Sequence, residues 1–325
     1  MILLFALILT AHLLCVNLAS AGPLVSIYAD FLDRRACQGA AQAGRFLNRG
    51  SLQALVVGTL IGILLGLLRW DGLYSGVVQR LWYKIQFGIW EWGFSVVLLA
   101  INLRLWREKD NVGSRRRWAR SLISLLAATN LLYHFPPLLY VLSDLVRRAE
   151  LDGAPLGAAG FRQRMLQPFI LAQTVHFWLA SFAVTGVVLA VWSIRSGGGG
   201  GGEGEGEGGG GEGGGEIGSP TGDSAEWARR GGRLALTVSL AQIPVGIWLL
   251  VSTPSLTMAR FLGADPASTL TFAAAVLLAM HLLHRLANLA LGELHRRSIA
   301  VAAASLVIVV FLMTLGLQLA QIKGP

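Results

Sequence analysis

Five histidines of this 325-residue chain lie inside long apolar stretches. They are His12, His134, His176, His281 and His284. An ionisable side chain deep in an apolar segment is costly and indicates a functional site. Imidazole in such a position suits axial ligation of haem iron, a common use of histidine in multi-helix bundles. We therefore expect the remainder of the chain to be a scaffold that brings these imidazoles together.

The composition is that of a membrane protein. The chain is 54% hydrophobic and 14% charged, with a mean hydropathy of +0.59. A net charge of +9 would suggest nucleic acid in a soluble protein, but here the arginines separate apolar stretches and act as topology signals. Membrane lipid is therefore an expected partner and nucleic acid is not. The two cysteines, Cys15 and Cys37, form no CxxCH motif, so no covalently attached haem is expected.

Eight apolar stretches predict an all-α, polytopic membrane helix bundle of about eight transmembrane helices. The first, Met1–Ser20, has no Lys or Arg before Arg34. A signal peptide needs a basic start, so we favour a retained span; cleavage after Ala21 is the alternative and would leave seven spans. The others are Leu52–Leu68, Trp82–Trp106, Trp118–Val146, Leu166–Trp192, Leu234–Val251, Ser268–Leu291 and Ser298–Leu319.

The distribution of basic residues predicts the orientation. With the N-terminus outside, the inside loops hold sixteen Lys and Arg residues, Arg120 among them, and the outside loops and tail hold nine. This bias follows the positive-inside rule. We expect an integral protein of the bacterial inner (cytoplasmic) membrane with both termini outside.

The glycine-rich segment divides the chain. Gly197–Gly215 is almost entirely Gly with scattered Glu, a composition that cannot bury apolar surface and predicts a disordered cytoplasmic linker. We therefore predict a five-helix haem-binding bundle over residues 1–195, a linker over 196–230 and a three-helix membrane block over 231–325. The Gly58, Gly62 and Gly66 spacing predicts a second helix that packs closely on a neighbour.

The histidines share one depth. At ~1.5 Å rise per residue, each lies roughly 15–24 Å from the outer end of its span. A single layer suits one or two haem b groups side by side and does not suit haems stacked across the membrane. His176 is the strongest ligand candidate. His12 and His134 have an alternative reading as interhelical hydrogen-bond partners, and for His134 the following Pro136-Pro137 frees carbonyls that its ring could bond.

The remaining candidates for cofactor binding each have alternative roles. His281 and His284 are three residues apart on one helix face, so one could ligate iron while the other contacts a propionate or a proton path. Arg285 could pair with a propionate or extend toward the interface. Glu91 could ligate haem, serve a proton path, or be an interfacial residue beside tryptophans.

Two stretches carry a family resemblance. Ala11–Asp30 resembles the first helix of cytochrome bd quinol oxidase subunit I, and Gln173–Arg195 resembles that family's fifth helix through Thr-Val-His-x-x-x-Ala-Ser-x-x-Val-Thr-Gly. The resemblance implies that His12 serves a high-spin haem and that His176 ligates a low-spin haem b. It covers about the first 195 residues, with Leu126–Leu142 similar to the family's fourth helix.

The chain departs from the family pattern. Glu91 stands alone where the third helix of the family carries a glutamate pair, and the connection Ser252–Ala267 is too short for a quinol-binding loop with Gly-Arg-Gln-Pro-Trp. The low-spin haem of the family takes a methionine from a later helix. Here Met280 precedes His281, so the partner of His176 could be either residue.

Two functions compete most directly. The first is a divergent, bd-oxidase subunit I-like b-type cytochrome that transfers electrons through haem iron held by His12, His176 and His281. It could be a quinol oxidase-type oxidoreductase subunit, with quinol, a second membrane subunit or a cytochrome c as candidate partners. The second is a proton- or metal-coupled transporter or assembly factor without haem. A purely structural membrane subunit is a third reading.

Overall fold

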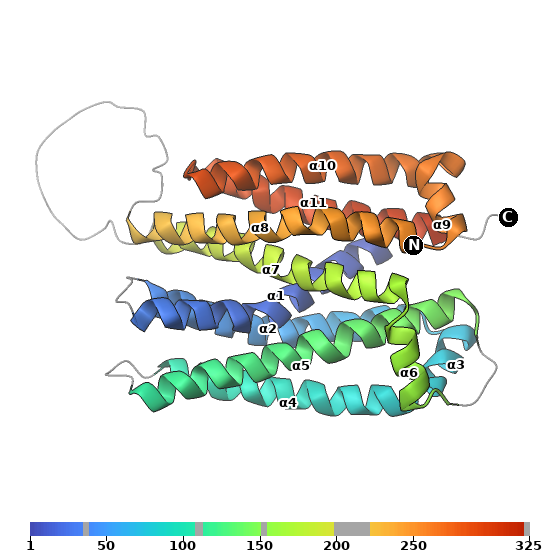
Figure 1. The fold of residues 1–325 in the computed structure, drawn as a ribbon, viewed down its shortest axis with the longest axis horizontal. Coiled ribbons are helices and arrows are strands. Elements are labelled where there is room, and N and C mark those ends of the chain that lie inside the picture. The colour runs from blue at the N-terminus through green and yellow to red at the C-terminus, as the bar shows by residue number, and fades with distance from the viewer. Residues whose placement is uncertain (35–38, 108–112, 151–154, 198–221, 322–325) are drawn as a thin grey trace, which may run out of the picture.

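The computed structural model describes residues 1–34, 39–107, 113–150, 155–197 and 222–321. The described residues form long helices joined by short helices and turns (Figure 1). These are α1 (Ile2–Arg34), α2 (Ala40–Leu68), α3 (Gly72–Arg80), α4 (Trp82–Arg107), α5 (Ser114–Arg147), α6 (Ala158–Met165), α7 (Pro168–Gly197), α8 (Asp223–Ser252), α9 (Ser255–Ala259), the π-type turn η1 (Arg260–Ala264), α10 (Pro266–Leu291) and α11 (Arg296–Gln321).

The predicted fold class is confirmed. Eight helices of the described residues are long and apolar enough to cross a membrane, and helices satisfy their own backbone hydrogen bonds where lipid offers no partner. The start of α1 and the end of α11 lie at one end of the bundle, beside α3, α6 and α9 (Figure 1). We call this the termini end and the other the opposite end. An even number of spans returns the chain to its starting side, so eight spans explain this placement.

The first two helices are longer than their apolar stretches. The prediction ended the first span at Ser20, yet α1 continues through Pro23 to Arg34, and α2 begins at Ala40 instead of Leu52. Small buried residues explain the extension, since Ala29 of α1 and Ala43 of α2 belong to one apolar cluster. Packing between the helices stabilises turns that hydropathy alone does not predict.

The second helix packs on α1 through glycine, as its spacing predicts. A Cβ on Gly58 would lie 3.0 Å from Cβ of Cys15, and a Cβ on Gly62 would lie 2.8 Å from Cε1 of His12. Gly66 is nearest to the Tyr74 hydroxyl of α3, at 3.5 Å. Gly58 and Gly62 therefore let α2 approach the helix that carries His12.

The five-helix and three-helix blocks meet through α7 and α8. A Cβ on Gly186 of α7 would lie 2.6 Å from the carbonyl oxygen of Gly231 on α8. Val187 and Ala190 of α7 share a buried cluster with Ala235 of α8. Of the predicted linker, residues 198–221 lie outside the described residues and 223–230 belong to α8. The two blocks are thus packed directly against each other.

Replacing Gly186 by leucine should separate α7 from α8. We expect Gly186→Leu to destabilise the protein by about 1–3 kcal/mol, because the new side chain would overlap the α8 backbone. The measurement is the thermal unfolding midpoint of the protein in detergent. Gly246→Leu is the matched control, since a Cβ at Gly246 meets nothing within 4 Å. Equal midpoints for the two variants would contradict the close crossing.

Candidate functional site

The levels of the histidines in the bundle follow from hydrogen bonds between helices. Ser181 of α7 donates to Oδ1 of Asn17 on α1 at 2.8 Å. Both helices run away from the termini end (Figure 1). His12 and His176 each precede this contact by five residues, so they lie at the same level.

A second contact places His134 there too. Nε1 of Trp178 on α7 donates to the carbonyl oxygen of Leu132 on α5 at 2.9 Å. These two helices run in opposite directions (Figure 1). His134 and His176 are each two residues nearer to the termini end than this contact, and they therefore share a level.

His281 of α10 is level with the others but is not beside them. Gln242 of α8 donates to the carbonyl oxygen of His176 at 3.4 Å, and Arg233 of α8 donates to that of Ala290 on α10 at 3.3 Å. Counted from the Arg233–Ala290 contact, the residue nine positions nearer the termini end is Gln242 on α8 and His281 on α10. His281 is therefore level with Gln242, which contacts His176. The single predicted layer thus agrees with the contacts, although α8 lies between α7 and α10 (Figure 1).

The α10 candidates form a separate group. Nε of Arg285 donates to Nε2 of His281 at 3.3 Å. The Met280 side chain is 58% exposed, and His284 is exposed as well. The structure therefore brings together the helices of His12, His134 and His176, and places the α10 residues on the far side of α8.

His12 is held in a defined tautomer. Its Nδ1 lies 2.8 Å from the carbonyl oxygen of Gly58, which can only accept, so Nδ1 carries the proton and Nε2 keeps a free lone pair. A metal-ligating histidine usually donates its other ring N–H to a carbonyl or carboxylate oxygen, which fixes the orientation of the ring. The hydrogen bond to Gly58 thus leaves Nε2 of His12 available for a further partner.

The imidazole ring of His176 makes no hydrogen bond with the described residues. Its Nδ1 is buried and has no hydrogen-bond partner, and no described residue bonds its Nε2. A buried polar atom without a partner is costly and needs a physical explanation. A ligand that the protein chain does not itself supply would provide one.

His134 and Glu91 have different surroundings. The His134 ring packs edge-on against Phe87 and Tyr133, with centroids 5.3 and 4.9 Å away, and it makes no hydrogen bond with a described residue. The carbonyl group of Glu91 accepts from Asn130 at 2.8 Å, and its side chain is half-buried. Aromatic packing accounts for the place of His134 without a ligand.

A buried ion pair was missed at the sequence level. Arg120, counted there as a loop charge, is buried on α5 and pairs with Asp30 of α1, which is 1% exposed. The guanidinium carbon of Arg120 also lies 4.0 Å from the ring centroid of Trp106 on α4. Removing one partner of such a pair costs about 3–5 kcal/mol, so this contact fixes α1, α4 and α5 at the opposite end.

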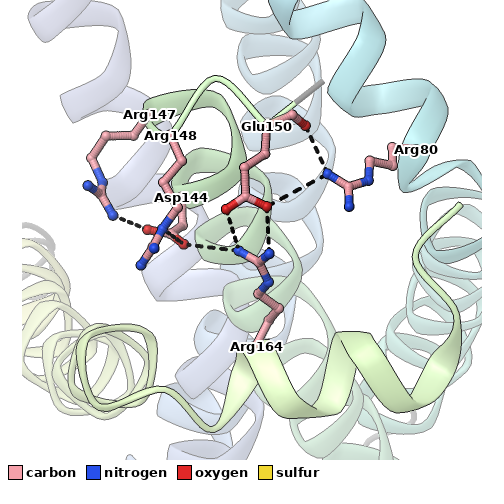
Figure 2. Close-up of polar contacts among 6 residues, drawn as sticks. All are labelled: Arg80, Asp144, Arg147, Arg148, Glu150 and Arg164. Carbon is pink, nitrogen blue, oxygen red and sulfur yellow. Dashed lines mark hydrogen bonds and ion pairs between the residues drawn. The ribbon is translucent and has the colours of Figure 1, made fainter. Parts of the chain in front are cut away.

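A second charged cluster, at the termini end, ties α3, α5 and α6 together (Figure 2). Asp144 is 1% exposed and accepts from Arg147 and Arg148. Arg164 of α6 donates to both oxygens of Glu150, at 3.0 and 2.5 Å, and Arg80 of α3 donates to the Glu150 carbonyl oxygen at 2.9 Å. The two carboxylates thus anchor the short helices near the start of α7.

No protein-family model and no curated protein sequence matches this chain. Among solved structures, the chain is similar to the structure of bd oxidase from Geobacillus thermodenitrificans, at 13% sequence identity and a TM-score of 0.68. The match covers 98% of this chain and 84% of that chain. At this identity the likeness shows a common helical membrane fold.

The Glu150 cluster predicts an acid-labile contribution to stability. Hydrogen bonds from Arg164 lower the pKa of Glu150 below its usual value. Stability from this pair is therefore present above the ordinary glutamate pKa and is lost as the pH falls through the lowered pKa in the folded protein. We expect Glu150→Gln to remove this part of the pH dependence of the unfolding midpoint between about pH 5 and pH 3.

The matched control is Glu293→Gln. Glu293 is exposed and forms no ion pair with a described residue. Unfolding midpoints that respond to pH identically in the parent protein and in Glu150→Gln would refute a role for the cluster in stability.

Proposed function

We propose that this chain is a haem-binding membrane subunit of the bd-oxidase type, in which His12 and His176 ligate haem iron and the bound haem carries electrons. The observation that carries the proposal is the half-buried ring of His176, whose buried Nδ1 has no hydrogen-bond partner, at the same level as His12. The fold shared with a bd oxidase over 98% of this chain supports it. The proposal includes an inner-membrane location with both termini outside.

The two imidazoles fit axial ligation in complementary ways. His12 has Nδ1 bonded to the Gly58 carbonyl group, which leaves Nε2 for iron. His176 has neither ring nitrogen bonded to a described residue. When bound, haem would supply the reversible one-electron chemistry of iron. The protein residues would hold the ring nitrogens in place and exclude water.

The two histidines serve different haems in this proposal. The His12 ring is turned toward α2, against Gly62, whereas Gln242 of α8 contacts the backbone at His176. The α10 candidates Met280 and His281 lie beyond α8 (Figure 1). An axial pair of His176 with either residue would require α8 to be displaced, so we propose His176 as a ligand without assigning its partner.

The transporter alternative lacks comparable support. Within the residues that the structure describes, no three His, Cys, Asp or Glu side chains converge as a metal-ion site would need. Nε2 of His281 accepts a hydrogen bond from the cationic side chain of Arg285. His281 in this arrangement is unsuited to bind a metal cation. Haem needs only one or two protein ligands, which the isolated rings of His12 and His176 could provide.

The first experiment is a dithionite-reduced minus oxidised absorption spectrum of the purified protein. We expect α-bands of b-type haem in the parent protein and loss of the low-spin band in His176→Ala, because the ligand is removed while the helix remains. His295 lies outside the spans, so His295→Ala is the control and should keep all α-bands of the parent protein. A spectrum unchanged by His176→Ala would exclude His176 as a ligand.

The second experiment moves His12 without removing it. Gly62→Ala places a Cβ 2.8 Å from Cε1 of His12, so the His12 ring must shift from its present position. We expect a lower haem-to-protein ratio with the His176-dependent band retained. Gly66→Ala is the control, because its Cβ would lie 3.5 Å from the nearest atom, the Tyr74 hydroxyl. Equal ratios in the two variants would argue against ligation by His12.

A further inference from the structure

A hollow of about 310 Å³ lies between α2 and α4, toward the opposite end of the bundle. It is lined by Arg45, Phe46 and Arg49 of α2 and by Leu103 of α4. The two helices are held in register there, since Nδ2 of Asn102 donates to Oδ1 of Asn48 at 2.6 Å. The hollow is therefore part of a fixed helix pair.

The described part of the chain supplies no ion-pair partner for the arginines of this hollow. No described carboxylate pairs with Arg45 or Arg49, nor with the exposed Arg104 beside Leu103. Arginines elsewhere do pair, as Arg120 does with Asp30 and Arg164 with Glu150. Counted over the described residues, this part of the surface carries unbalanced positive charge and is complementary to an anion.

The lining is apolar as well as basic. Arg45 and Arg49 are four residues apart, which places them on one helix face about 6 Å apart along the axis. Between them Phe46 stacks on Trp192 of α7, with ring centroids 5.2 Å apart and planes inclined by 17°. Leu103 supplies the other apolar wall. A simple inorganic anion would use the arginines but leave these walls unfilled.

The position suits a molecule at the edge of the membrane. The apolar stretch of α2 begins at Leu52, three residues after Arg49, so the arginines lie at headgroup level. Basic pockets between transmembrane helices at this level are typical binding places for anionic lipid headgroups. Guanidinium groups bind phosphate oxygens through paired hydrogen bonds.

We propose that this hollow binds one anionic phospholipid, with Arg45 and Arg49 on its phosphate and with Phe46 and Leu103 against the start of an acyl chain. The site does not involve the histidines. It is therefore independent of haem binding.

Native mass spectrometry of the full chain in detergent, titrated with phosphatidylglycerol or phosphatidylcholine, tests the proposal. We expect phosphatidylglycerol to bind with one tight site and phosphatidylcholine to bind far more weakly. Arg45→Gln/Arg49→Gln should weaken phosphatidylglycerol binding ~30-fold, the factor that corresponds to about 1 kcal/mol for each arginine.

Arg296→Gln/Arg297→Gln is the matched control, because it removes the same charge from exposed residues at the same end of the bundle. It should leave the tight site unchanged. If the double variant at the hollow aggregates, Arg49→Gln alone replaces it, with an expected loss of ~5-fold.

Three results would overturn the proposal. They are equal binding of the two lipids, equal losses in the hollow and control variants, and displacement of phosphatidylglycerol by inorganic phosphate at the same concentration. The last result would identify a site for free phosphate, in which the apolar walls have no role.

Discussion

A polar side chain inside a membrane bundle must find its partner within the protein, because lipid supplies none. Several polar side chains of the described helices meet this constraint by bonding one another. Thr10 bonds Thr314, Asn17 bonds Ser181 and Asn48 bonds Asn102, each across two helices. These contacts set the register of the bundle. Among the described residues, the buried Nδ1 of His176 is one of several side-chain atoms that these contacts leave without a hydrogen-bond partner.

The arrangement of the helices explains how distant stretches reach that ring. Helix α7 contacts α1, α5, α8 and α11, so His176 lies where both blocks of the chain meet. The glycine contact between Gly186 and Gly231 brings α8 close enough for Gln242 to reach the His176 carbonyl group. The surroundings of His176 therefore depend on the packing of α7 against α8, the helices that precede and follow the glycine-rich segment in the chain.

The sequence predicted the spans and their common histidine layer, because hydropathy and helical rise determine both. It could not predict lateral placement. His281 is level with His176, yet α8 lies between their helices (Figure 1), and nothing in the hydropathy of α8 specifies its neighbours. Arg120 shows a related limit, since only the fold reveals that Asp30 neutralises it. The extension of α1 past Pro23 likewise depends on packing with α2.

Haem extraction with iron quantitation per chain is the sharpest test of haem binding by the imidazoles of His12 and His176. The protein purified from membranes of cells supplied with iron and haem precursor should contain one or two protohaem groups per chain, with iron in the same ratio. A correctly folded, monodisperse protein that contains neither iron nor extractable haem would rule out haem binding by these histidines.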